Sequence, residues 1–251
     1  MLAKSQIIVL HTIKHGDSGM VVQCYSNIYG KQSLYLKLLS KHLGKFANIH
    51  RLSVLDIITY SNGTSSMPII KEVLPVFNLG GIRTNIYKNT MAIFISELLC
   101  KSIREVEANN TLFEFLKASI GILNSIEEGM ANFHIHFMVH LSKMLGFKPL
   151  DNYSYQMPLF CINTACFTEA YLVFDGQRCI IDQSRTTTHF KAEESLLLHT
   201  ILNTAFTNIS SIKCTGELRL AFAKQMIIYI SHHLGINIEI KSLDVLHEVF
   251  K

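Results

Sequence analysis

The sequence predicts an α+β fold, in which a small β-barrel is followed by an α-helical domain. Up to about residue 75 the apolar residues form short, β-branched runs separated by turn residues. Beyond that point they recur with the spacing of amphipathic helices. Apolar residues make up 49% of the 251 residues, which is enough for packed cores. We therefore expect two domains, at residues 1–77 and 78–251.

Five strands are expected in the first domain. Turn stretches such as HGDSG and SNGTSS separate them and supply the Gly and Asn residues that tight turns need. Five short strands without a long helix must close on themselves to hide their edges, and the small barrel that does so is the OB-fold. An SH3-like barrel is the alternative. The apolar runs are QIIVLHTIK (6–14), GMVVQCYS (19–26), SLYLK (33–37), LSVLDIITY (52–60) and MPIIKEVLP (67–75).

The segment 37–49 lies between the third and fourth expected strands, where we predict a short helix or a loop. Three helices should follow the barrel and pack as a bundle: one ending near Arg104, one capped by Asn109 or Asn110, and one from Asn132 to Gly146. An irregular insert is expected at about 150–190. Two further helices (193–206 and 215–235) and a short one (242–250) complete the chain.

The positive charge is concentrated near the N-terminus. Residues 1–70 contain seven Lys or Arg and two acidic residues, whereas the other 181 residues contain sixteen basic and seventeen acidic ones. Aromatic rings lie among these cations, a combination typical of single-stranded nucleic-acid binding. The rings are Tyr25, Tyr29, Tyr35 and Phe46. The predicted phosphate contacts are Lys4, Lys14, Lys31, Lys37, Lys41, Lys45 and Arg51.

The cysteines of the insert do not form a convincing zinc site. A structural zinc site needs four ligands, usually as two closely spaced pairs. Cys161 and Cys166 could form one pair, but Cys179 stands alone, and the nearest later histidine is His189. We expect reduced thiols that pack among apolar neighbours, and no metal or other cofactor.

No catalytic motif is present either. His136 and His140 are one helical turn apart, but position 137 is Phe, where a metalloprotease helix needs Glu. We expect these histidines and Lys143 on a solvated or phosphate-contacting face. Phosphate-binding glycine loops and nucleophile elbows do not occur in the sequence, so we expect no enzyme and no catalytic residues. A metal-dependent hydrolase and an interaction scaffold without a nucleic-acid role stay open as alternatives.

No apolar run reaches the ~18 residues of a bilayer span, so we expect a cytoplasmic protein without membrane contact. Several strings, in order, also resemble RecO, the bacterial recombination mediator, in its Bacteroidetes form. The resemblance runs almost end to end. The strings are KSQIIVLHTIKHGDSGMVVQCYSNIYGKQSLYL, IKEVLP, MAIFISELLCKSIREVEANNTLFEFL, NFHIHFMVHLSKMLGFKP and IYISHHLGINIEIKSLDVLHEVF.

This resemblance implies an N-terminal OB-fold, a helical domain and a non-enzymatic mediator located at the nucleoid. Such a mediator binds single- and double-stranded DNA, anneals complementary strands, and works with RecR, and in some cases RecF, to load RecA onto DNA coated by single-stranded-DNA-binding protein (SSB). Many RecO proteins carry a four-cysteine zinc module, and here the insert lacks both CxxC pairs, so the resemblance implies a degenerate module. The acidic, apolar SSB tail would need a pocket beside a cation, for which we predict Lys101 or Arg104.

Overall fold

The computed structural model describes residues 1–16, 19–37, 49–61, 67–104, 106–170, 172–175, 178–181 and 188–251. The chain divides into two compact units, Met1–Ser125 and Ile126–Lys251. The strands of the first unit end at Pro75 and its first helix begins at Gly80, so the predicted boundary at residue 77 falls where strands give way to helices. The boundary between the two compact units follows Ser125 and therefore lies 48 residues beyond the predicted one.

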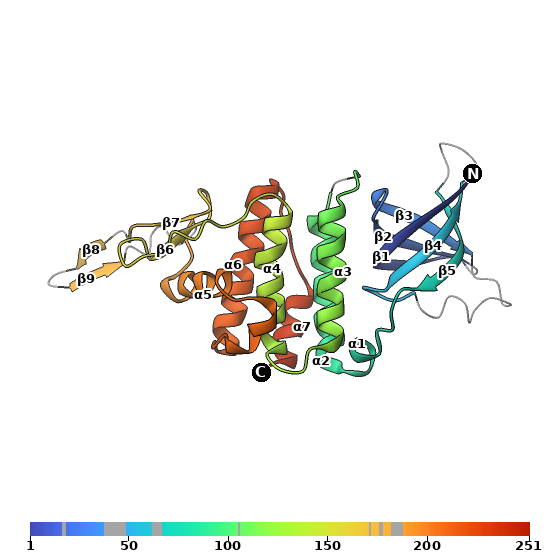
Figure 1. Cartoon of the computed structure of the whole chain (residues 1–251). Helices are drawn as coiled ribbons and strands as arrows, with labels where there is room; N and C mark the ends of the chain where they lie inside the picture. The colour runs from blue at the N-terminus through green and yellow to red at the C-terminus, as the bar shows by residue number, and fades with distance from the viewer. Residues whose placement is uncertain are drawn as a thin grey trace. The chain divides into compact units, whose positions relative to one another are not determined.

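The first unit begins with the predicted five-stranded OB-fold barrel, which this structure confirms (Figure 1). Consecutive strands pair antiparallel from β1 to β3, and β4 pairs with both β1 and β5. One parallel pair, Tyr35 with Ile69, joins β3 to β5 and closes the barrel. The strands are β1 (Leu2–His15), β2 (Gly19–Ser26), β3 (Gly30–Lys37), β4 (Val54–Tyr60) and β5 (Ile69–Pro75).

The period-2 alternation of the strands fills the barrel with apolar side chains. Leu34 and Leu36 of β3 are fully buried, whereas the alternating residues Tyr35 and Lys37 lie on the outer face. The core consists of Ile7, Val9, Val22, Cys24, Leu34, Leu36, Ile49, Leu55, Ile57 and Ile70. The predicted segment 37–49 falls almost entirely on residues 38–48, which lie outside the described residues.

Three helices pack with the barrel in this unit: α1 (Gly80–Thr84), α2 (Ile86–Ser102) and α3 (Asn110–Ser125). Each long helix begins at an asparagine cap. The Asn85 side chain accepts hydrogen bonds from the first turn of α2, and Asn109 accepts one from Leu112 at 3.0 Å. The Ser96 hydroxyl of α2 donates to the Leu10 carbonyl of β1, which attaches this helix to the barrel.

The second unit is helical and contains α4 (Phe133–Met144), α5 (Ala192–Leu202), α6 (Gly216–Leu234) and α7 (Ser242–Val249). The predicted bundle of three helices is divided between the units, since α2 and α3 belong to the first and α4 to the second. Packing of the three as one bundle stays a prediction. Among the described residues, no helix combines the length and the apolar character that crossing a bilayer requires.

The insert predicted as irregular contains two short antiparallel hairpins. The first pairs β6 (Leu159–Cys161) with β7 (Cys166–Thr168), and the second pairs β8 (Leu172–Asp175) with β9 (Arg178–Ile181). Strands of three or four residues are too short to produce a readable alternation in the sequence, and this is why the prediction missed them.

Candidate nucleic-acid interface

One corner of the barrel places a predicted cation, Lys37, on the same face as two rings. In the sheet register Gly19 pairs with both His15 and Lys37, so these two residues lie on either side of β2. The His15 and Tyr35 rings meet edge to face, with centroids 6.0 Å apart. A side chain at position 19 would collide with the Tyr35 hydroxyl, so the glycine leaves room for the ring. We call His15, Tyr35, Lys37 and the exposed Lys14 the corner cluster; Lys14 is the neighbour of His15 in the chain, and the alternation of β1 directs its side chain to the opposite face of the strand.

The corner cluster offers what single-stranded nucleic acid needs: cations for phosphates and ring faces for bases. Its two lysines are exposed, at the end of β1 and at the end of β3. His15 was not among the predicted residues, because only the strand register places it beside Tyr35. The alternation of β1 does indicate that residues 13 and 15 share a face. It does not indicate which side chain of β3 lies beside them.

Lys31 lies at the other end of β3 and has a structural contact. Its ammonium group donates hydrogen bonds to the carbonyl oxygens of Cys100 at 2.5 Å and Ile103 at 2.7 Å. These carbonyls belong to the last turn of α2 and its cap, where a helix lacks internal donors and carries partial negative charge. Burial lowers the pKa of the Lys31 ammonium; the nearby Cys100 raises it and Arg104 lowers it further. A phosphate contact by Lys31 stays a prediction.

Three more cations lie around the same end of α2. Burial raises the pKa of the Cys100 thiol, while the charges of Lys31, Arg51 and Lys101 act to lower it. Lys101 also forms an ion pair with Glu97 at 3.0 Å, whereas Arg104 is exposed. The predicted DNA contact Arg51 and the predicted SSB-tail contacts thus lie near one another in the first unit.

The remaining predicted cations are elsewhere. Lys4 pairs with Ile58 across β1 and β4, and Ile58 pairs in turn with Glu72 of β5. Cross-strand partners face the same side, so Lys4 and the acidic Glu72 share a surface away from the corner cluster. Lys41 and Lys45 lie outside the described residues, as does Phe46. The seven predicted phosphate contacts therefore do not form a single described patch.

The predicted base-stacking rings differ in their exposure to solvent. Tyr25 is 0% exposed, packs on Phe113 of α3 and accepts a hydrogen bond from the Asn109 amide, so its prediction as a base-stacking ring is wrong. Docking of α3 onto the barrel, which strand periodicity does not reveal, removes this ring from solvent. Tyr29, in the turn between β2 and β3, is 44% exposed.

Two of the three cysteines of the insert are near one another along the backbone. Cys161 pairs with Cys166 across the first hairpin and with His189 through an isolated bridge. Cys161 is buried, and the Cys166 thiol contacts the Thr164 hydroxyl at 3.2 Å. Within the described part of the chain, no group of three or more His, Cys, Asp or Glu residues is arranged to hold a metal ion. The side chain of Cys179 lies outside that part.

Two of the three histidines of α4, His134 and His136, are buried, and His140 is half-buried. His136 is 0% exposed, donates from Nε2 to the Thr204 carbonyl at 2.7 Å, and stacks on His140 with centroids 4.4 Å apart. The prediction that these histidines share a solvated face is therefore wrong for His136. The physical reason is that Phe206, from the segment before α6, covers this side of α4.

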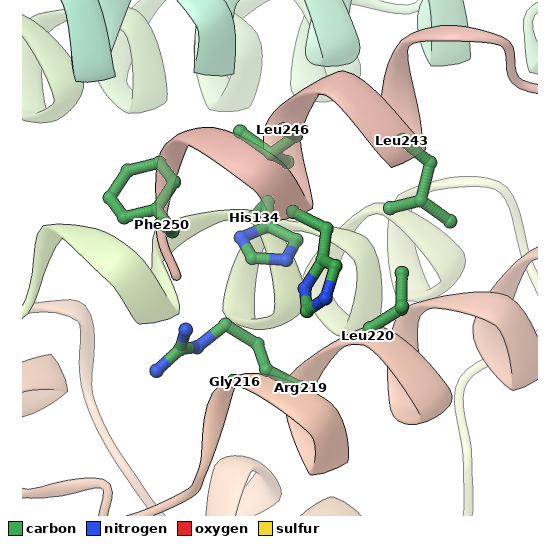
Figure 2. Close-up of a pocket in the computed structure, with 8 residues that line it drawn as sticks. His134, Gly216, Arg219, Leu220, Leu243, Leu246 and Phe250 are labelled. Carbon is green, nitrogen blue, oxygen red and sulfur yellow. The ribbon is translucent and has the colours of Figure 1, made fainter.

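His134 lines a small cavity where α7 and α6 meet α4. Figure 2 shows it between the apolar side chains of α7 and Arg219 of α6. Burial, followed by the Arg219 charge, lowers the pKa of His134 to about 3. The interior volume is about 10 Å³, room for about one water molecule, so this cavity is too small for an organic ligand.

Comparisons with known proteins agree on one family. A family profile described as "Recombination protein O C terminal" matches residues 83–244. A protein named "DNA repair protein RecO" from Azobacteroides pseudotrichonymphae is 29% identical over 100% of both chains. One with the same name from Christiangramia forsetii is 28% identical over 100% of both chains. Another, from Bacteroides fragilis, is 31% identical over 61% of this chain and 64% of its own length.

Proposed function

Because the chain belongs to the RecO family of DNA repair proteins, we propose that it is a non-enzymatic recombination mediator. It binds single- and double-stranded DNA, anneals complementary strands and helps to load RecA onto SSB-coated single strands. It works in the bacterial cytoplasm, at the nucleoid, with RecR and SSB as partners and with RecF in some settings. The observation that carries the proposal is the corner cluster on a closed OB-fold barrel.

The chemistry of strand handling follows from this corner. Lys14 and Lys37 neutralise phosphates and release their counterions, which makes binding independent of sequence but dependent on salt. The Tyr35 ring stacks on a base, and every base offers a ring face for such stacking. Contacts of this kind leave the hydrogen-bonding edges of the bases free, which is what pairing with a complementary strand requires.

We expect the double variant Lys14→Glu/Lys37→Glu to bind a single-stranded oligonucleotide roughly twentyfold more weakly near 0.1 M salt. The slope of log affinity against log salt should fall by about 1.4, since each lost phosphate contact removes about 0.7 on a single strand. Both lysines are exposed, so the thermal melt should not change. Fluorescence anisotropy over a salt series measures both quantities.

Lys224→Glu is the matched control, because it reverses one exposed charge on α6 of the second unit. If the wild-type chain and the double variant bound the oligonucleotide with equal affinity, the role of the corner cluster would be contradicted. If the wild-type chain itself passed unretained over single-stranded DNA, the interaction-scaffold alternative would replace the DNA-handling proposal. Stoichiometric zinc in the purified protein would instead favour the metal-dependent alternative.

We place the SSB tail at the end of α2, with Arg104 as its cation and Lys101 as the second candidate. Arg104 is the better placed of the two, because Lys101 is paired with Glu97. Arg104→Ala should weaken binding of an acidic SSB C-terminal peptide about fivefold, as expected for one exposed charged contact. Isothermal calorimetry measures this, with Lys117→Ala on α3 as the control, and wild-type affinity in Arg104→Ala would reject the assignment.

A further inference from the structure

Two adjoining cavities open where the barrel meets α1 and α2, within the first unit. One has a volume of about 300 Å³ and is lined by Arg51, Arg83 and Asn89, among others. Its neighbour has a volume of about 400 Å³ and is lined by Phe77 and Asn78. His50, Leu79 and Arg83 line both, so the two cavities are neighbours, and we treat them as two parts of one site. Volumes of this size are typical of small-ligand sites.

The side chains of this site suit a phosphate and a base. Arg51 and Arg83 are exposed, and an arginine guanidinium can bind a phosphate through two parallel hydrogen bonds. Phe77 is half-buried and offers a ring face, while Asn78 and Asn89 can donate and accept hydrogen bonds. Among the described residues that line the two cavities, none carries a carboxylate that would neutralise Arg51 or Arg83 within the lining.

The turn that carries Arg51 is held in an unusual backbone conformation. Leu52 has a positive φ of 61°, although it is not a glycine, and its side chain is 0% exposed. The conformation is maintained by β1, because Leu52 donates to the Val9 carbonyl at 2.7 Å and the Val9 amide donates to Ser53 at 2.9 Å. Strained residues that the surrounding structure holds in place are concentrated at binding sites, where they fix a side chain before the ligand arrives.

We propose that this site binds one nucleotide of single-stranded DNA, with its phosphate between Arg51 and Arg83 and its base against Phe77. The inference rests on the proposed DNA-handling function and extends it, because Phe77 and Arg83 lie outside the strands of the barrel. A strand that contacts both this site and the corner cluster would be bound by both barrel and helices of the first unit. The α1 residue Arg83 is therefore a DNA contact in its own right.

The chain contains no tryptophan, so Phe77→Trp introduces a single fluorescent reporter at the stacking position. Saturation with an oligo(dT) of about 15 nucleotides, within the usual site size of an OB-fold, should quench its emission by base stacking. An oligonucleotide with abasic sites and the same phosphates should bind but leave the emission unchanged. Tyr155→Trp is the control: position 155 is 99% exposed in the second unit, and its emission should not respond.

A second variant tests the phosphate contact without altering the ring. Arg83→Ala should weaken oligo(dT) binding about fivefold near 0.1 M salt and lower the salt slope by about 0.7, and Arg83→Lys should restore the slope. If the wild-type chain bound no oligonucleotide at all, the proposed function and this site would both be overturned. Normal binding by the wild-type chain, with unquenched Phe77→Trp emission and an unchanged slope in Arg83→Ala, would overturn this site alone.

Discussion

The variant Lys31→Glu should lose about 2 to 3 kcal/mol of unfolding free energy, an effect on stability that a surface lysine would not produce. In the native chain this ammonium supplies two hydrogen bonds to the end of α2, at 2.5 and 2.7 Å. Hydrogen bonds from a charged donor contribute about 1.5 to 3 kcal/mol each, and part of that is lost to solvent because Lys31 is half-buried. A glutamate would also place negative charge beside two carbonyl oxygens and the negative helix end.

Urea denaturation followed by circular dichroism at 222 nm measures this loss. Lys37→Glu is the matched control, since it makes the same charge reversal six residues along the same strand, at an exposed position. Lys31→Met should lose less than Lys31→Glu, because it removes the donor without adding the repelling charge. A melt of Lys31→Glu that coincides with that of Lys37→Glu would show that the contact with α2 does not stabilise the unit.

The second large expectation is acid sensitivity of the second unit. Burial lowers the pKa of His134 to about 3 and that of His140 to about 4, and in His140 the charges of His136, Lys143 and Lys148 act in the same direction. Burial also lowers the pKa of His136, although its contact with the Thr204 carbonyl raises it in part. All three histidines are therefore neutral in the folded chain near pH 7.

These shifts decide the direction of the pH effect. A histidine whose pKa is lower in the folded chain than its unfolded value of about 6.5 binds fewer protons when folded. The unfolded chain then gains protons as the pH falls below 6.5, and stability decreases until the folded pKa values are reached near pH 4 to 3. At pH 5 one fully buried neutral histidine costs about 2 kcal/mol, so His134 and the half-buried His140 together should cost about 3 kcal/mol, and His136 acts in the same direction.

Denaturation curves at pH 7.5 and pH 5 test this expectation. His140→Phe keeps a ring against His136 and Phe206 but cannot be protonated, so its loss between the two pH values should be about 1 kcal/mol smaller than that of the wild-type chain. His232→Gln, at an exposed position of α6, is the control and should behave as the wild-type chain does. Equal stability of the wild-type chain at the two pH values would contradict the buried, neutral state of these histidines.

Much of the fold was predictable because it depends on local patterns. The expected strand at 19–26 coincides with β2, and the expected cap Asn109 accepts the hydrogen bond that starts α3. The insert was less predictable, since its strands are only three or four residues long. The candidate site was predictable in residue type but not in grouping. Arg83, for instance, is an ordinary surface arginine in the sequence, and only the meeting of α1 with the barrel places it beside Arg51.

Lys31 and Lys37 show what the sequence alone does not predict. Both lie on β3, six residues apart, and the alternation of the strand puts both on its outer face. The sequence by itself determined this alternation, and with it the barrel, the helices and the surplus of cations on the first unit. Only the tertiary structure decided which cation is available: the end of α2 occupies Lys31, whereas Lys37 stays exposed beside Tyr35 and His15. Side-chain direction is a local property of the backbone, but what a side chain meets depends on residues distant in the sequence.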